Sequence, residues 1–206
     1  MSRADQEPQP AGQRPKRRRR TPDEARREAL VAARRLLIES GPTAITLKAV
    51  AGDIGVTHAN LIHHFGSAAG LQSALMGSMV RDLTDALAET VVLLRAEAGA
   101  PRALTDSVFD AFDKGGAGRL AAWIVLSGDL KHLEPVRAAV QDLVNAIHER
   151  LAEGEATRHR ITGAVLFMAL CAFGDAVIGP PLRDMLDRDE DSARRIVARF
   201  LPSYFQ

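Results

Sequence analysis

The chain has 206 residues, of which 26% are charged and 46% hydrophobic, and its formal net charge is +1 at pH 7. Its single cysteine, Cys171, excludes an intramolecular disulfide and fits a reducing compartment, so we expect a cytoplasmic protein. The first residues lack the apolar core of a secretion signal.

Residues 1–20 differ sharply from the rest of the chain in charge. They contain seven Lys or Arg and two acidic residues, a net +5, and the remaining 20 basic and 24 acidic residues give −4. The segment has no apolar periodicity, so we predict a disordered basic arm. Its run of Arg17, Arg18, Arg19 and Arg20 is expected to lie along DNA phosphates or to enter the minor groove. The alternative is a tail that only improves solubility.

The first helix is expected to begin at Pro22, with Thr21 as its cap, and to end at Gly41-Pro42. Asp23 and Glu24 complement the positive end of its dipole. Apolar residues occupy one face and arginines the other. This helix should pack across the two shorter helices that follow.

Two short helices joined by a tight turn are predicted between Ile45 and Leu71. Thr46 caps the first helix and Thr57 the second. Gly55 ends the first helix, because a left-handed residue is costly for a side chain with a Cβ. The buried face of the pair is formed by Leu47, Val50, Ala51, Ile54, Leu61 and Phe65.

The outward side of the second short helix carries small and polar groups that suit the major groove of B-DNA. The predicted DNA-binding residues of the two helices are Thr46, Lys48, Thr57, His58, Ala59, Asn60, His63 and His64. The spacing alone also fits a helical hairpin inside a bundle. A metal site is not predicted, because the three histidines lack the i, i+4 spacing and a flanking acid.

Thirteen residues in this region resemble the signature of the tetracycline-repressor (TetR) family of bacterial regulators. They are Thr46, Leu47, Lys48, Val50, Ala51, Gly55, Val56, Thr57, Leu61, His64, Phe65, Ser67 and Leu71. Ile62 and Ala68 stand where the family usually has a Tyr and a Lys that touch the DNA backbone. Both departures imply weaker phosphate binding unless another group compensates, and the basic arm is one such group.

The rest of the chain is expected to be helical, which makes the protein all-α. Ser67 caps a long helix with apolar residues from Leu71 to Leu94, and further helices follow Pro101, surround Leu120 to Leu126 and follow Pro135. We predict a three-helix DNA-binding domain over 21–70 and a helical ligand-binding and dimerisation domain over 71–206. In the resembling family, the long helix transmits ligand binding to the DNA-binding helices.

Two helices near the end of the chain, about 161–178 and 191–203, are expected to pair with a second subunit in a four-helix bundle. The segment 161–178 is apolar on nearly every side, and its only charge is Asp175. Its length approaches that of a membrane span, but we interpret it as buried within the protein and predict no membrane partner. The alternative is an internal core helix of a monomer.

The second domain is long enough for one core and one cavity. Candidate ligand-binding residues are Phe109, Phe112, Arg119, Trp123, His148, Phe167, Met168, Cys171 and Asp175. The alternative for each of these residues is an ordinary position in the core. A second alternative for Cys171 is a role in redox sensing. The sequence contains no phosphate-binding glycine loop and no Glu-x-x-His pair of a di-iron bundle, so we expect no cofactor and no enzyme.

These features predict a bacterial DNA-binding regulator that acts as a homodimer on a palindromic operator. We expect a repressor that a small apolar molecule releases from DNA. Two alternatives remain, an architectural DNA binder without an effector and a helical-bundle enzyme.

Overall fold

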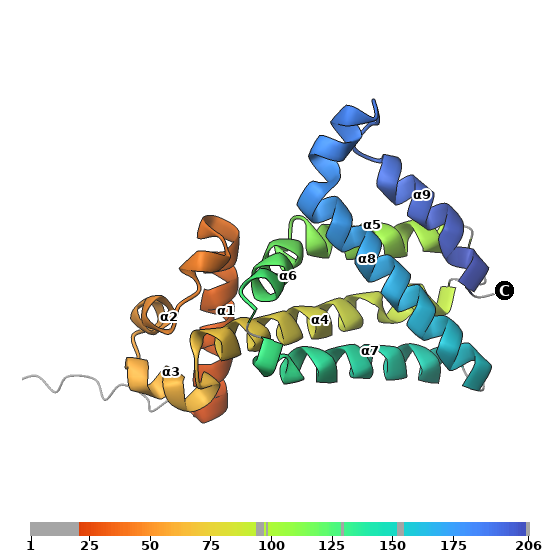
Figure 1. The fold of residues 1–206 in the computed structure, drawn as a ribbon. Helices are drawn as coiled ribbons and strands as arrows, with labels where there is room; N and C mark the ends of the chain where they lie inside the picture. Colours follow the sequence, from red (N-terminus) through yellow and green to blue (C-terminus); the bar gives the residue numbers. More distant parts are fainter. Residues whose placement is uncertain (1–20, 94–96, 98, 129, 152–154, 205–206) are drawn as a thin grey trace, which may run out of the picture.

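The structure, a computed structural model, describes residues 21–93, 97, 99–128, 130–151 and 155–204. The predicted arm over 1–20 and residue Leu94 lie outside this range. The regular structure of the described residues is entirely helical, as predicted (Figure 1). The α-helices are α1 (Pro22–Ser40), α2 (Leu47–Ile54), α3 (His58–Phe65), α4 (Ala68–Leu93), α5 (Ala100–Phe112), α6 (Ala117–Leu126), α7 (Glu134–Leu151), α8 (Glu155–Met185) and α9 (Ser192–Phe200). Three 3-10 turns are η1 (Pro42–Ala44), η2 (Leu130–His132) and η3 (Leu201–Tyr204).

The predicted helix caps of the first four helices are present. The side chain of Thr21 accepts from the Glu24 amide at 3.2 Å, and that of Ser67 accepts from the Gly70 amide at 3.0 Å. Gly55 ends α2 with φ 66° and ψ 40°, in the left-handed region that favours glycine. The local sequence therefore determines where these helices begin and end.

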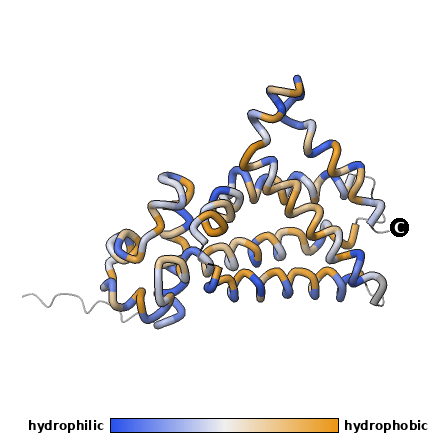
Figure 2. The backbone as a smooth tube through the Cα atoms, in the orientation of Figure 1, coloured by the Kyte–Doolittle hydropathy of each residue, from blue (hydrophilic) through white to orange (hydrophobic). Residues whose placement is uncertain are grey.

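The described residues form two hydrophobic cores, and α4 runs through both (Figures 1 and 2). The first core joins α1, α2 and α3 to the first half of α4, from Leu71 to Met79, and to α6 through Leu120. The second joins the other half of α4 to α5, α8 and α9, with Phe109 and Val197 buried. The first core thus extends beyond residue 70, where we expected one domain to end.

Helices α4 and α7 lie side by side (Figure 1), and their backbones approach closely at Gly77. A Cβ atom at Gly77 of α4 would lie 2.5 Å from the carbonyl oxygen of Pro135 in α7. Real side chains do not approach so closely, so only glycine fits at this crossing.

Helix α8 is longer than the predicted 161–178 segment and continues through Pro180 and Pro181 to Met185. Asp175 and Arg183, one before and one after the two prolines, form an ion pair along the helix. This contact spans the turn in which the prolines remove two backbone donors.

Residues Thr157–Met185 of α8 are long and apolar enough to cross a membrane by length and composition, with a mean hydropathy of 2.1. A single helix of this kind is weak evidence for a membrane span. Only 22% of its most apolar window is buried within the chain, so the expectation that this helix is covered on all sides is wrong for one subunit.

Candidate functional site

Helix α3 packs against α1 with one side, and its other side faces solvent. Its residues Leu61 and Phe65 are buried on the packed side. The guanidinium of Arg26 in α1 donates to the carbonyl oxygen of His64 at 3.0 Å and lies 4.7 Å from the centre of the Phe65 ring. Contacts at the end of α3 therefore fix the direction in which the helix presents its outer face.

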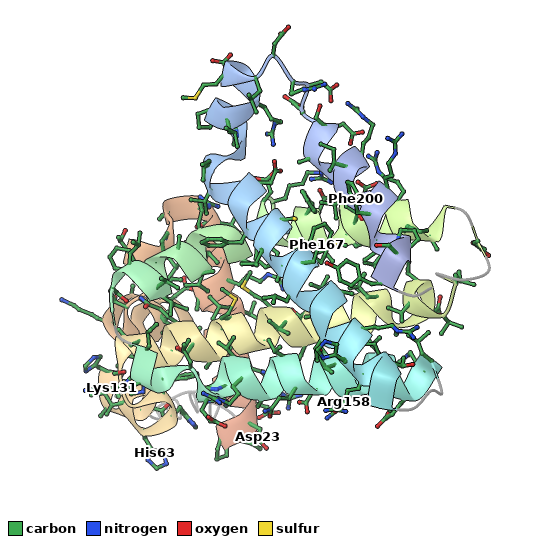
Figure 3. All side chains as sticks on the ribbon, turned by 45° about the vertical axis from the view of Figure 1, so that its right-hand side comes forward. Asp23, His63, Lys131, Arg158, Phe167 and Phe200 are labelled. Atoms are coloured by element: carbon green, nitrogen blue, oxygen red, sulfur yellow. The ribbon has the colours of Figure 1, made fainter. Side chains whose placement is uncertain are left out.

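The outer face of α3 brings the predicted polar residues together. His58, Ala59, Asn60 and His63 are exposed, and His64 is half-buried with its ring 5.7 Å from that of His63. Figure 3 shows His63 projecting away from the body of the protein. A short helix with exposed donors and acceptors at its beginning has the dimensions needed to enter a major groove.

The two capping threonines have a structural role in addition to the predicted contact with DNA. The hydroxyl of Thr46 accepts from the Ala49 amide at 3.1 Å, and that of Thr57 accepts from the Asn60 amide at 3.2 Å. Each hydroxyl keeps its proton for donation to a phosphate oxygen. Lys48 is exposed in the first turn of α2, two residues after Thr46.

The beginning of α1 lies next to α3. A surface hollow is lined by Thr21 and Pro22 from α1 and its cap, and by Asn60, His63 and His64 from α3. Residue 21 is where the predicted basic arm joins the described chain. Thr21, the first described residue after the predicted arm, therefore lies beside the exposed face of α3.

The second half of the molecule contains an apolar cavity of about 140 Å³ between α4, α5, α7 and α8. Every residue that lines it is apolar. They are Val80, Leu83, Leu87, Val91, Leu104, Val108, Phe112, Val140, Leu143, Ile147, Ile161, Ala164, Val165, Met168, Ala169 and Leu201. An apolar cavity of about 150 Å³ can remain dry and bind a molecule the size of benzene.

Two of the candidate ligand-binding residues, Phe112 and Met168, line this cavity. Phe109 is only 1% exposed and belongs to the surrounding core. The ring of Phe167 stacks on Tyr204 at 5.5 Å between centroids, and Trp123 is 36% exposed on α6. The aromatic candidates are therefore distributed among cavity, core and surface.

The polar candidates lie outside the cavity lining. Arg119 is exposed, and Asp175 is paired with Arg183. Burial raises the pKa of the Asp175 carboxyl although Arg183 opposes this shift, and burial also raises the pKa of the Cys171 thiol. The Nε2 atom of His148 is buried and lacks a hydrogen-bond partner among the described residues.

The aliphatic lining from α4 and α7 was absent from the candidate set. Leu83, Leu143 and Ile147 are three such residues. Their helical periodicity was visible in the sequence, but periodicity does not distinguish a residue beside a cavity from one in a filled core.

Helices α8 and α9 leave a large apolar face exposed. Its residues are Leu166, Leu170, Val177, Ile178, Leu182, Met185, Ile196 and Phe200. Helix α9 is attached to α5 by ion pairs, in which Arg102 contacts Asp191 at 2.6 Å and Arg194 contacts Asp110 at 2.8 Å. These pairs hold α9 in place while the apolar side chains of its outer face remain uncovered.

Residues 29–75 match the sequence model of the tetR family of bacterial regulatory proteins. No curated protein matches the chain. Among solved structures, the fold resembles the multidrug binding protein EbrR complexed with ethidium, with a TM-score of 0.60 and 20% identity over 85% of this chain and 97% of that one. It also resembles a structure assigned to the TetR family of transcriptional regulators from Mesorhizobium loti MAFF303099, with a TM-score of 0.55 and 15% identity over 91% of this chain and 98% of that one.

Proposed function

Because the chain belongs to the TetR family of bacterial regulatory proteins, we propose that it is a repressor that leaves a palindromic operator when a small apolar molecule binds. Membership of this family makes the chain a DNA-binding transcriptional regulator and not an enzyme. A regulator of bacterial DNA acts in the cytoplasm. The exposed outer face of α3 is the observation that carries this proposal.

The apolar face of α8 and α9 supports a homodimer through these two helices, approximately residues 161–178 and 191–203. An exposed apolar face of this kind favours association with a complementary surface. A second copy of the same face is complementary by two-fold symmetry. Two copies of α3 related by a two-fold axis would read the two halves of a palindrome.

The cavity supports a neutral apolar effector. None of the lining residues carries a charge, so a cation that entered would lose its hydration without gaining a counter-charge. The neighbour EbrR was crystallised with ethidium. A ligand of that size would require the cavity described here to open, whereas a single-ring aromatic would not.

Selection of bound fragments from a pool of genomic DNA tests the operator. We expect the full chain to recover a palindrome, and a variant without residues 1–20 to recover the same palindrome with lower affinity and a weaker dependence on salt. The physical reason is that phosphate contacts supply affinity, whereas base contacts supply specificity.

The alternative, an architectural DNA binder without an effector, predicts a different result in the same experiment. Binding would then show no sequence motif and would disappear when residues 1–20 are removed. That outcome would contradict the proposed function.

Filling the cavity should separate ligand response from DNA binding. We expect Leu143→Trp to retain operator binding and to abolish the rise in Tm caused by toluene, because the indole ring occupies the cavity. A ligand at 100 times its Kd stabilises the protein by about 2.7 kcal/mol, which thermal unfolding detects easily. Leu126→Trp is the matched control, because Leu126 is exposed on α6 and lies outside the cavity lining. An equal response to toluene in both variants would show that the effector binds elsewhere.

A further inference from the structure

A turn from the second half of the molecule lies against the junction between α3 and α4. Turn η2 places the Nε2 atom of His132 3.5 Å from the side-chain oxygen of Ser67. The same oxygen caps α4 by accepting from the Gly70 amide. Residues 130–132 are therefore adjacent to the helix that directly follows α3.

Lys131 occupies the middle of this turn and is exposed. Figure 3 shows Lys131 and His63 at the same end of the molecule, while Arg158 and Phe200 lie far from them. No carboxylate in the described part of the chain pairs with Lys131. Its ammonium group is therefore available to an external anion beside α3.

The start of α4 lacks a cation where the DNA backbone would pass. Ala68 is the first residue of α4, and Ile62 presents an apolar side chain on α3 with 44% exposure. Neither side chain can donate to a phosphate. A protein that places α3 in a major groove gains affinity from cations at the bordering phosphates.

We propose that Lys131 contacts a DNA phosphate beside α3, so that the effector domain supplies part of the DNA interface. The proposal rests on the DNA-binding function and adds to it a contact from outside the three-helix domain. Lysine suits this position, because its compact charge on a flexible stem can reach a phosphate without a fixed geometry.

The same contact would connect DNA affinity to the cavity. Helix α7 begins at Glu134, two residues after His132, and its residues Val140, Leu143 and Ile147 line the cavity. A ligand that displaces α7 would therefore also displace Lys131. The loss of a phosphate contact is then one route by which the ligand lowers affinity for DNA.

The test is the salt dependence of binding by Lys131→Ala to two duplexes, the selected palindrome and one of unrelated sequence. Removing one phosphate contact from each subunit should decrease the slope of log affinity against log salt by about 1.8 and weaken binding roughly 30-fold near 0.15 M salt. Both duplexes should be affected alike, because a phosphate contact does not depend on sequence.

Two control variants make the outcome specific. Arg160→Ala removes an exposed cation from α8, two residues from Arg158 at the far end of the molecule, and should leave the slope unchanged. Asn60→Ala should weaken binding to the palindrome alone. Identical slopes for Lys131→Ala and Arg160→Ala would overturn the inference and leave the regulator intact, whereas the absence of a palindrome for the unaltered chain would overturn the proposed function itself.

Discussion

Replacing Leu170 with glutamate is expected to convert the proposed homodimer to a monomer and to lower operator affinity by about 10²- to 10⁴-fold, the usual gain from linking two binding sites. Leu170 is 61% exposed on the apolar face of α8. In a symmetric dimer the substitution would bury two unpaired carboxylates at one interface, which costs far more than the apolar contact gains. Analytical ultracentrifugation measures the mass, and titration of the palindrome measures the affinity.

The matched control for this experiment is Val92→Glu. Val92 is exposed to a similar degree on the last turn of α4, outside the apolar face of α8 and α9. This variant should remain a dimer with unaltered affinity. A Leu170→Glu protein that keeps the dimer mass would place the interface on another surface.

The Asn60→Ala and His63→Ala variants are expected to lose about 1 to 3 kcal/mol of specific binding each, the usual value of a good contact to a base edge. Both side chains are exposed on the outer face of α3 and contribute nothing to the core beneath it. The dimer mass and the affinity for unrelated DNA should stay the same. Competition binding with both duplexes measures the difference.

Ile62→Ala is the control within the same helix. Its side chain is exposed but apolar, so its removal should change specificity little. Unaltered operator affinity in both the Asn60 and the His63 variant would contradict the assignment of this face to base recognition.

The amino-terminal third of the fold could be predicted because its signals are local. A threonine cap or a left-handed glycine such as Gly55 acts on residues within one turn, and the structure shows each where the sequence placed it. The TetR resemblance depended on the same residues, and the family comparison confirmed it. The exposed residues of α3 could be predicted because its buried residues, Leu61 and Phe65, recur at the helical period.

The cavity could not be predicted in the same way, because it depends on how distant helices pack. Phe109 and Phe112 are three residues apart in one helix, yet one belongs to the filled core and the other lines the cavity. The helices packed around α5 decide this difference, and the sequence of α5 alone does not reveal how they pack. For the same reason the sequence did not reveal that the first core continues past the predicted boundary at residue 70, through Leu71 to Met79 of α4.

The close approach of Gly77 in α4 to Pro135 in α7 limits how the two helices can move against each other. Side chains between two helices normally absorb small shifts by changing rotamer. At the crossing of α4 and α7 the backbones of Gly77 and Pro135 lie against each other, with no flexible side chain between them. The two helices therefore cannot move closer at this point by a change of rotamer. We expect a ligand that pushes on the cavity side of α7 to rotate the helix about this crossing and so to move Lys131, which lies four residues before Pro135.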